Sequence, residues 1–286
     1  KPLIQPVIYL VYSLLSISAA MIILCLFYRL AIILFFLSFS YTELIDATNY
    51  LNHYYLVCLL AFIMICLPAN RAFSLDTRRK PRLKLSKVSV WTINVLILQI
   101  SIVYFCAGFA KLNADWLLRA MPLAVWLPAK ADFPLLGHLF AHPWTPFIFS
   151  WFGAFYDLTI AFFLLYKPTR PFAYVAVLAF HILTKLLFNI GLFPFIMIFC
   201  TLIFFSGEFH ERLLGYLGYR SEPKNSFDQK YKAGLIPESL ILSTKTFLFS
   251  AFFLIQILLP FRFLLYSGNV LWTEESYRFS CRVMLL

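Results

Sequence analysis

Residues 88–111 read Val-Ser-Val-Trp-Thr-Ile-Asn-Val-Leu-Ile-Leu-Gln-Ile-Ser-Ile-Val-Tyr-Phe-Cys-Ala-Gly-Phe-Ala-Lys and carry no charged side chain before the final lysine. An apolar run of about 20 residues is long enough for an α-helix to cross the hydrocarbon core of a bilayer. Similar runs predict eight helices in all, over residues 6–27, 30–44, 54–67, 88–111, 146–166, 171–188, 192–206 and 243–265. We therefore predict an all-α fold, a polytopic bundle of transmembrane helices.

The composition of the whole chain agrees with this class. Of its 286 residues, 62% are hydrophobic and 13% are charged, whereas soluble domains have about 25% charged residues. A soluble globule of this size has too little interior for so much apolar surface. A disordered chain is poor in aromatic residues and rich in charge. Both classes are therefore excluded, and the lipid bilayer is an expected partner.

The net charge of +11 is concentrated in particular loops. Loop 68–87 has Asp76 as its single acid against a set of basic residues, namely Arg71, Arg78, Arg79, Lys80, Arg82, Lys84 and Lys87. Basic loops stay in the cytosol, and alternation of the helices then places residues 43–46, the 112–143 loop and the C-terminal tail outside. The charge thus indicates orientation, and we expect no nucleic acid partner.

Two domains are predicted. Residues 1–265 form the transmembrane helical domain, and residues 266–286 begin an external C-terminal domain, lumenal or periplasmic. The alternation also places Lys1 outside with neither an initiating Met nor a signal peptide before it. The last ten residues alternate like the opening of a strand. We therefore expect the natural protein to extend beyond both ends of this sequence.

Lys111 is the first polar residue that calls for an explanation, because an ionisable side chain in a membrane span is costly and marks a functional site by default. One interpretation is that it extends to the interface beside Asp115 and Trp116. The other is that it stays in an apolar cavity, where desolvation would keep it neutral and able to act as a base.

Two further polar groups lie at or within predicted spans. The first group, at the external ends of the second and third spans, comprises Glu43, Asp46, Thr48, Asn49, Asn52 and His53. The second comprises Asp157, His181, Lys185 and Asn189, for which an internal salt bridge such as Asp157 with Lys185 is the structural explanation. Together with Lys111 they predict a cavity that opens to the external side and suits a quinone. No cysteine or histidine spacing indicates a metal site, so no metal is expected.

Several segments resemble the vitamin K-dependent γ-glutamyl carboxylase family, whose membrane part is of the HTTM type, in animal enzymes and bacterial homologues. The resemblance is strongest in Ile102-Val-Tyr-Phe-Cys-Ala-Gly-Phe-Ala-Lys111-Leu-Asn-Ala-Asp-Trp116. Further similar segments follow the family order, at residues 46–56, 60–62, 68–76, 157–165, 180–193 and 272–280. Family members have a first helix and a large external domain that this sequence lacks. Where some carry two adjacent lysines, Ala110 precedes Lys111 here.

The resemblance implies γ-carboxylation of protein Glu residues coupled to oxidation of vitamin K hydroquinone to the epoxide, with O2 and CO2 as co-substrates. It implies a Glu-containing protein or peptide as the substrate. The enzyme would lie in the endoplasmic reticulum membrane in an animal, or in the inner membrane of a bacterium, with its site on the lumenal or periplasmic side.

The resemblance also implies roles for individual residues. Lys111 matches the base that deprotonates the hydroquinone, and His53 matches a histidine implicated in carboxylation. Supporting roles fall on Asp46, Asn52, Asp115 and Asp157. The segment near the quinone contains His181, Asn189 and Phe193, and the segment linked to the peptide contains Trp272 and Tyr277.

Three other functions stay open. The same fold could hold a quinone-binding oxidase or epoxidase without efficient carboxylation. A transporter also has charged residues within the membrane and interrupted helices, although the sequence shows no internal repeat. A purely structural membrane scaffold is the third.

Overall fold

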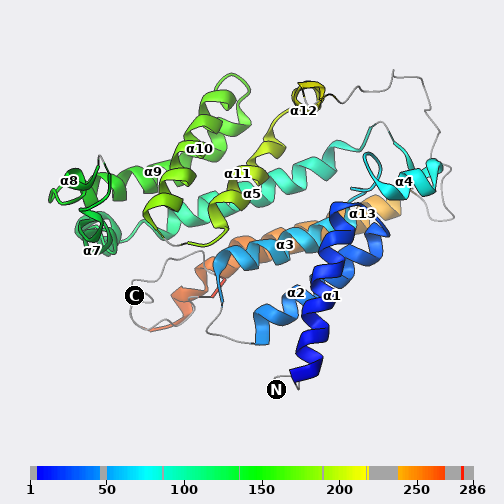
Figure 1. Ribbon diagram of the computed structural model, residues 1–286, viewed down its shortest axis with the longest axis horizontal. Helices are drawn as coiled ribbons and strands as arrows, with labels where there is room; N and C mark the ends of the chain where they lie inside the picture. Colours follow the sequence, from blue (N-terminus) through cyan, green and yellow to red (C-terminus); the bar gives the residue numbers. More distant parts are fainter. Residues whose placement is uncertain are drawn as a thin grey trace. The chain divides into compact units, whose positions relative to one another are not determined.

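A computed structural model describes residues 5–45, 50–85, 87–134, 136–188, 190–216, 218, 238–267 and 278–279. All regular secondary structure in these ranges is helical, which confirms the predicted all-α class (Figure 1). The chain divides into two compact units, Lys1–Gln99 and Ile100–Leu286, so that helix α5 (Val90–Ala110) contributes to both. Each unit is described by itself.

The first unit is built on three helices in succession. Helix α1 (Gln5–Ile23) packs on α2 (Tyr28–Ile45), and α2 packs on α3 (Asn52–Cys66). Buried Tyr28, Ile32 and Ala61 form the centre of this packing. The Tyr28 hydroxyl donates a hydrogen bond to the Met64 carbonyl at 2.8 Å, so the start of α2 is tied to the end of α3. Helix α4 (Leu75–Arg79) and the short 3-10 helix η2 (Pro81–Leu83) follow.

The second unit contains the rest of α5 and the helices after it. Its longer helices are α9 (Thr145–Leu165), α10 (Arg170–Leu187), α11 (Phe193–Thr201) with η4 (Leu202–Phe204), α12 (Gly207–Tyr216), and α13 (Glu238–Leu258) with η5 (Leu259–Leu265). Helix α10 packs against both α9 and α11, and Figure 1 shows these three helices side by side. Helix α13 ends and η5 begins just before Pro260. Proline has no backbone N–H to donate the next α-helical hydrogen bond, so it interrupts the α-helix there.

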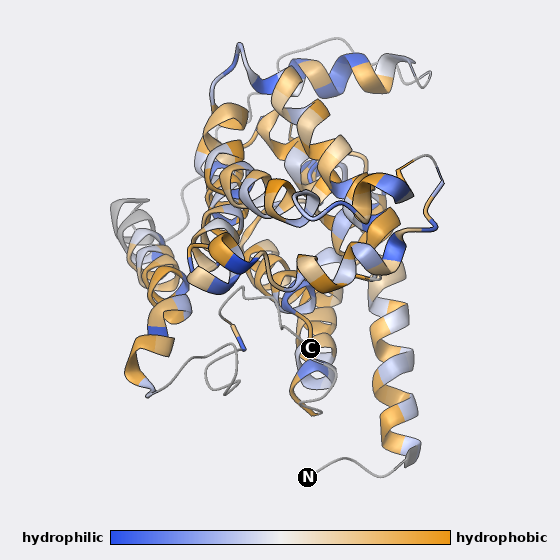
Figure 2. Cartoon of the chain, turned by 90° about the vertical axis from the view of Figure 1, so that its left-hand side faces the viewer, coloured by the Kyte–Doolittle hydropathy of each residue, from blue (hydrophilic) through white to orange (hydrophobic). Residues whose placement is uncertain are grey.

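The predicted apolar runs all fall on helices, but they differ in length. Six helices of the described residues are long and apolar enough to cross a membrane, and the protein is an integral membrane protein. Helix α3, the third predicted span, has only 15 residues. The seventh predicted span corresponds to α11 with η4, which is followed by α12 at an angle of 116°. The bent pair counts as one further span if its two parts are taken together. Most helical turns are coloured hydrophobic in Figure 2, and large apolar side chains such as Phe172 are exposed on the surface of the helices.

The predicted external loop 112–143 contains several short helices. These are α6 (Ala114–Arg119), α7 (Leu123–Trp126), η3 (Pro128–Lys130) and α8 (Gly137–Phe140). Leu123, Leu127, Phe140 and Leu187 of α10 form a buried apolar cluster, so the loop folds onto the helical unit by hydrophobic packing. It thereby closes one end of α9, which α6, α7 and α8 all contact.

Asp76 holds the basic loop against the start of α2. Its carboxylate accepts hydrogen bonds from the Phe27 amide at 2.8 Å and the Tyr28 amide at 3.0 Å, and from the Asn70 side chain at 2.9 Å. The amides at a helix N-terminus have no partner within the helix and carry partial positive charge. The single acid of the basic loop is therefore buried as a cap for α2.

We predict that Asp76→Asn lowers the free energy of unfolding by about 1–3 kcal/mol, because it weakens buried hydrogen bonds to a charged group. Burial alone would raise the pKa of Asp76, but hydrogen bonds from Asn70, Tyr28 and Phe27 and the charge of Arg79 bring it below its ordinary value of 3.8. The stabilisation is therefore complete above that pH and is lost as the pH falls through the lower, folded-state pKa. Thermal unfolding in detergent, followed from neutral pH to about pH 3, measures both effects.

Asp132→Asn is the matched control, because Asp132 is an exposed acid. It should leave the unfolding midpoint unchanged. Equal midpoints for Asp76→Asn and the unaltered protein at neutral pH would show that the cap is not needed.

Candidate active site

Helices α5 and α9 approach each other closely at Gly108. A Cβ atom on this glycine would lie 2.7 Å from the Leu158 backbone nitrogen and 2.8 Å from the Leu158 Cγ. Real Cβ atoms do not come so near to backbone, and glycine is the residue that allows two helices in a membrane to pack at this distance. The contact fixes the depth at which the end of α5 faces Asp157 of α9.

Lys111 and Asp157 form an ion pair directly after this contact. The Lys111 Nζ atom lies 2.5 Å from Asp157 Oδ2, and the two side chains are only 13% and 7% exposed. Lys111 also donates a hydrogen bond to the Ala107 carbonyl at 3.2 Å, and its Nζ lies 5.3 Å from the centre of the Trp116 ring. Two charges removed from water are tolerated where they pair with each other. A proton can therefore pass between amine and carboxylate without leaving the site.

His181 of α10 lies in an aromatic enclosure beside this pair. Its ring is 1% exposed, and its Nε2 lies 3.1 Å from the Tyr104 hydroxyl of α5. Tyr104, Tyr156, Phe180 and Phe193 surround it with ring centroids 5.3–6.4 Å away. Within the described part of the chain, His181 Nδ1 and the Tyr156 hydroxyl are buried without a hydrogen-bond partner. Two such atoms in one apolar enclosure are available to a ligand or a water.

Helix α6 closes the site from the end of α9. Asn113 caps this helix by accepting a hydrogen bond from the Trp116 amide at 2.9 Å. The Trp116 indole donates to the Ser150 carbonyl at 2.9 Å, and the fully buried Ser150 hydroxyl donates back to the Trp116 carbonyl. These reciprocal bonds hold the Trp116 ring in its place near the Lys111 amine.

Several residues predicted from the sequence come together here. Lys111, Asp157, His181 and Phe193 all belong to this enclosure in the second unit. Asp115 is near it in sequence and is buried, but its carboxylate forms an ion pair with Arg119 at 2.8 Å. The suggested salt bridge between Asp157 and Lys185 is wrong, because Lys185 instead donates to the Gly191 carbonyl at 3.1 Å.

His53 and Asn52 belong to the first unit, at the start of α3. His53 is buried, with 7% of its surface exposed, and its ring lies 4.5 Å from that of Tyr54. The Tyr50 hydroxyl donates to the Asn52 side-chain oxygen at 3.2 Å. Their place in one site with Lys111 stays a prediction. Other predicted site residues lie outside the described residues, namely Asp46, Asn189, Trp272 and Tyr277.

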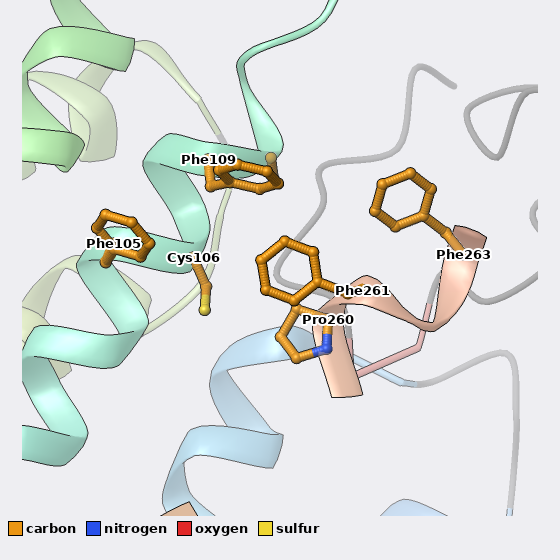
Figure 3. Close-up of a pocket in the computed structure, with 7 residues that line it drawn as sticks. Phe105, Cys106, Phe109, Pro260, Phe261 and Phe263 are labelled. Carbon is orange, nitrogen blue, oxygen red and sulfur yellow. The ribbon is translucent and has the colours of Figure 1, made fainter. Parts of the chain in front are cut away.

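An apolar pocket lies on another side of α5. Phe105, Cys106 and Phe109 face Pro260, Phe261 and Phe263 of η5 across it (Figure 3). Little free space remains between these side chains, and the centroids of the Phe109 and Phe261 rings lie 4.9 Å apart. Lys111 is not among its lining residues, although Ala110 is. Both Phe105 and Phe109 are exposed, so the pocket is open at the surface of α5.

Tyr104, Gly108 and Trp116 are site residues that the sequence analysis did not assign. They lie inside the segment that resembles the carboxylase family most strongly, and residues 104, 108 and 111 follow the three-to-four-residue spacing of one helix face. That spacing, read backwards from Lys111, is the signal that could have found Tyr104 and Gly108, whereas Trp116 lies on α6 and does not share it.

Two family models match the chain. The model described as HTTM domain matches residues 1–209. The model described as vitamin K-dependent gamma-carboxylase, lumenal domain, matches residues 242–286. No solved structure matches the chain. The first match covers well over half of the sequence and includes Lys111, Asp157 and His181, whereas the second covers Trp272 and Tyr277.

We predict that Gly108→Ala destabilises the protein by about 1–3 kcal/mol, because the added methyl group must push α5 away from α9. Gly153→Ala, a glycine of α9 with nothing within 4 Å of the added Cβ, is the matched control. It should be neutral or gain up to about 1 kcal/mol from helix propensity. Thermal unfolding midpoints in detergent measure the difference, and equal midpoints for the two variants would contradict the close approach.

Proposed function

The chain belongs to the HTTM domain family of vitamin K-dependent carboxylase-like membrane proteins, and on this premise we propose that it carries out γ-carboxylation of protein Glu residues coupled to epoxidation of vitamin K hydroquinone. The observation that carries the proposal is the Lys111–Asp157 pair, buried beside an aromatic enclosure. The substrates are a Glu-containing protein or peptide, the hydroquinone, O2 and CO2.

Lys111 is the base in this proposal, and Asp157 accepts the proton that the lysine must first lose. An amine can take a proton from a hydroquinone hydroxyl only when it is neutral. The carboxylate at 2.5 Å can first accept the proton of the ammonium group, which leaves a neutral amine and a neutral acid in a place where separate charges are costly. The pair can thus release and store one proton without water.

Two features of the enclosure support a quinone as its ligand. His181 Nδ1 and the Tyr156 hydroxyl offer buried polar atoms, and the rings around them offer flat apolar surface. When bound, the deprotonated hydroquinone reacts with O2 and supplies the strong base that removes a γ-proton from Glu, and CO2 adds to the resulting carbanion. The chain's own contribution there is to exclude water, which would otherwise quench the carbanion.

The apolar pocket at Phe105 and Phe109 suits the hydrocarbon tail rather than the ring. Its lining side chains are aromatic or aliphatic apart from the Cys106 thiol, so they offer hydrocarbon contact rather than partners for quinone oxygens. Phe105 and Phe109 are exposed on a helix long enough to cross a membrane, which supports entry of a membrane-dissolved quinone at this place. We propose that the site faces the lumenal side of the endoplasmic reticulum in an animal or the periplasm in a bacterium.

Lys111→Ala in the full-length gene product should abolish both activities, with a fall of at least about 100-fold, because no other amine replaces the base. Epoxide is measured by chromatography, and carboxylation by incorporation of labelled CO2 into a Glu peptide. A small primary amine added to the variant should restore part of the epoxidation, and more so at higher pH, because the free amine is the active form. Asp157→Asn should lower both activities by about 10–100-fold.

Lys130→Ala is the control for these variants, because Lys130 is an exposed lysine and should keep full activity. If Lys111→Ala retains epoxidation, the proposed base is refuted. If the unaltered protein forms epoxide but never carboxylates the peptide, it is a quinone epoxidase of the same fold, which the Lys111–Asp157 site supports equally well.

His53→Ala should lower carboxylation more than epoxidation, so that epoxide formed per carboxylated Glu rises about tenfold or more. The reason is that His53 is a buried imidazole at the position that the family resemblance connects with carboxylation. His138→Ala, an exposed histidine of α8, is the control and should leave the ratio unchanged. Equal falls in both activities would contradict a separate role for His53.

A further inference from the structure

The segment of residues 68–89 leads from the short apolar helix α3 into α5, one of the six helices that are long and apolar enough to cross a membrane. It therefore lies at one end of a membrane span. It presents a basic cluster of six exposed side chains, namely Arg78, Arg79, Lys80, Arg82, Lys84 and Lys87. Its single acid, Asp76, is buried and bonded to the start of α2. In the described residues of this segment no acid is therefore exposed to offset the cluster.

The basic cluster is held in a defined shape. The amides of Leu75 and Asp76 donate to the carbonyls of Leu24 and Cys25, each at 3.1 Å, which fixes α4 to the turn between α1 and α2. Ser74 caps α4 by accepting from the Thr77 amide at 3.0 Å. A little further on, the Leu85 amide donates to the Arg71 carbonyl at 3.1 Å. The cations are thus positioned by the backbone, so a ligand need not order the segment itself.

Exposed apolar side chains lie beside the cluster. Phe27 is 49% exposed and Phe73 is 64% exposed, and the Arg79 guanidinium lies 4.0 Å from the centre of the Phe27 ring. Val88 and Val90 are exposed where the segment enters α5. Apolar side chains next to cations are typical of a surface that rests at the boundary between headgroups and acyl chains.

We propose that the basic cluster is a binding site for anionic phospholipid headgroups in the leaflet at which it lies. Charge complementarity is the reason: six cations without an exposed acid meet a surface that carries phosphate and carboxylate groups. The exposed aromatic and aliphatic side chains favour a lipid over free phosphate, because they need an acyl region to contact. A role in setting the orientation of the protein during insertion would require only that the charges be present. The fixed arrangement of the basic cluster favours, in addition, equilibrium binding of particular lipids.

The test is native mass spectrometry of the delipidated full-length protein in detergent, titrated with phosphatidylserine or with phosphatidylcholine. We expect the first phosphatidylserine to bind about tenfold more tightly than phosphatidylcholine. This preference needs only a small part of the binding free energy that six cations near an anionic surface can supply. The triple variant Arg78→Gln, Arg82→Gln, Lys84→Gln should reduce this preference to about twofold or less. Raising the ionic strength should reduce it as well.

The charge-conserving triple variant Arg78→Lys, Arg82→Lys, Lys84→Arg is the matched control and should keep the preference. Arg79 is left unaltered in both variants because it contacts Phe27. Unfolding midpoints confirm that both variants fold. The proposal is overturned if the unaltered protein shows no preference, if the glutamine variant keeps it, or if free inorganic phosphate at equal concentration displaces the lipid.

Discussion

The ion pair between Lys111 and Asp157 is the constraint on which the second unit depends. A charge within a membrane protein must meet an opposite charge or a hydrogen-bonding partner, and here the two partners come from different helices. The end of α5 must therefore face the middle of α9 at one depth. Gly108 permits the approach, and the bonds between Trp116 and Ser150 hold α6 across it. The packing of the site follows from this one pairing.

The membrane helices could be predicted from the sequence because hydrophobic length is a local property. The pairing of Asp157 could not, because it depends on how helices cross. Within one helix, His181 and Lys185 share a face, and that spacing makes Lys185 a plausible partner for an acid. Lys185 lies in the last turn of α10, however, where the Gly191 carbonyl is the nearer acceptor. Only the crossing of α5 and α9 brings Lys111 to Asp157.

Gly108 and Tyr104 could not be predicted as site residues for a related reason. A membrane helix is apolar toward lipid and toward its neighbours alike, so hydrophobic periodicity does not show which face packs. Tyr104 and Gly108 of α5, followed by Lys111, lie on the face that meets α9 and α10. For Asp76, the sequence indicates only that it is the single acid of a basic loop. Its role as a cap depends on contact with Tyr28, 48 residues away in the sequence, which no local pattern contains.

The surroundings of Lys111 also decide how the amine could become a base. The amine meets the Asp157 carboxylate and the Ala107 carbonyl at the C-terminal end of α5. Of these two groups, only the carboxylate can take up a proton. In the proposed function the base is then the pair, because the amine can accept a proton from the hydroquinone only after Asp157 has taken one from it.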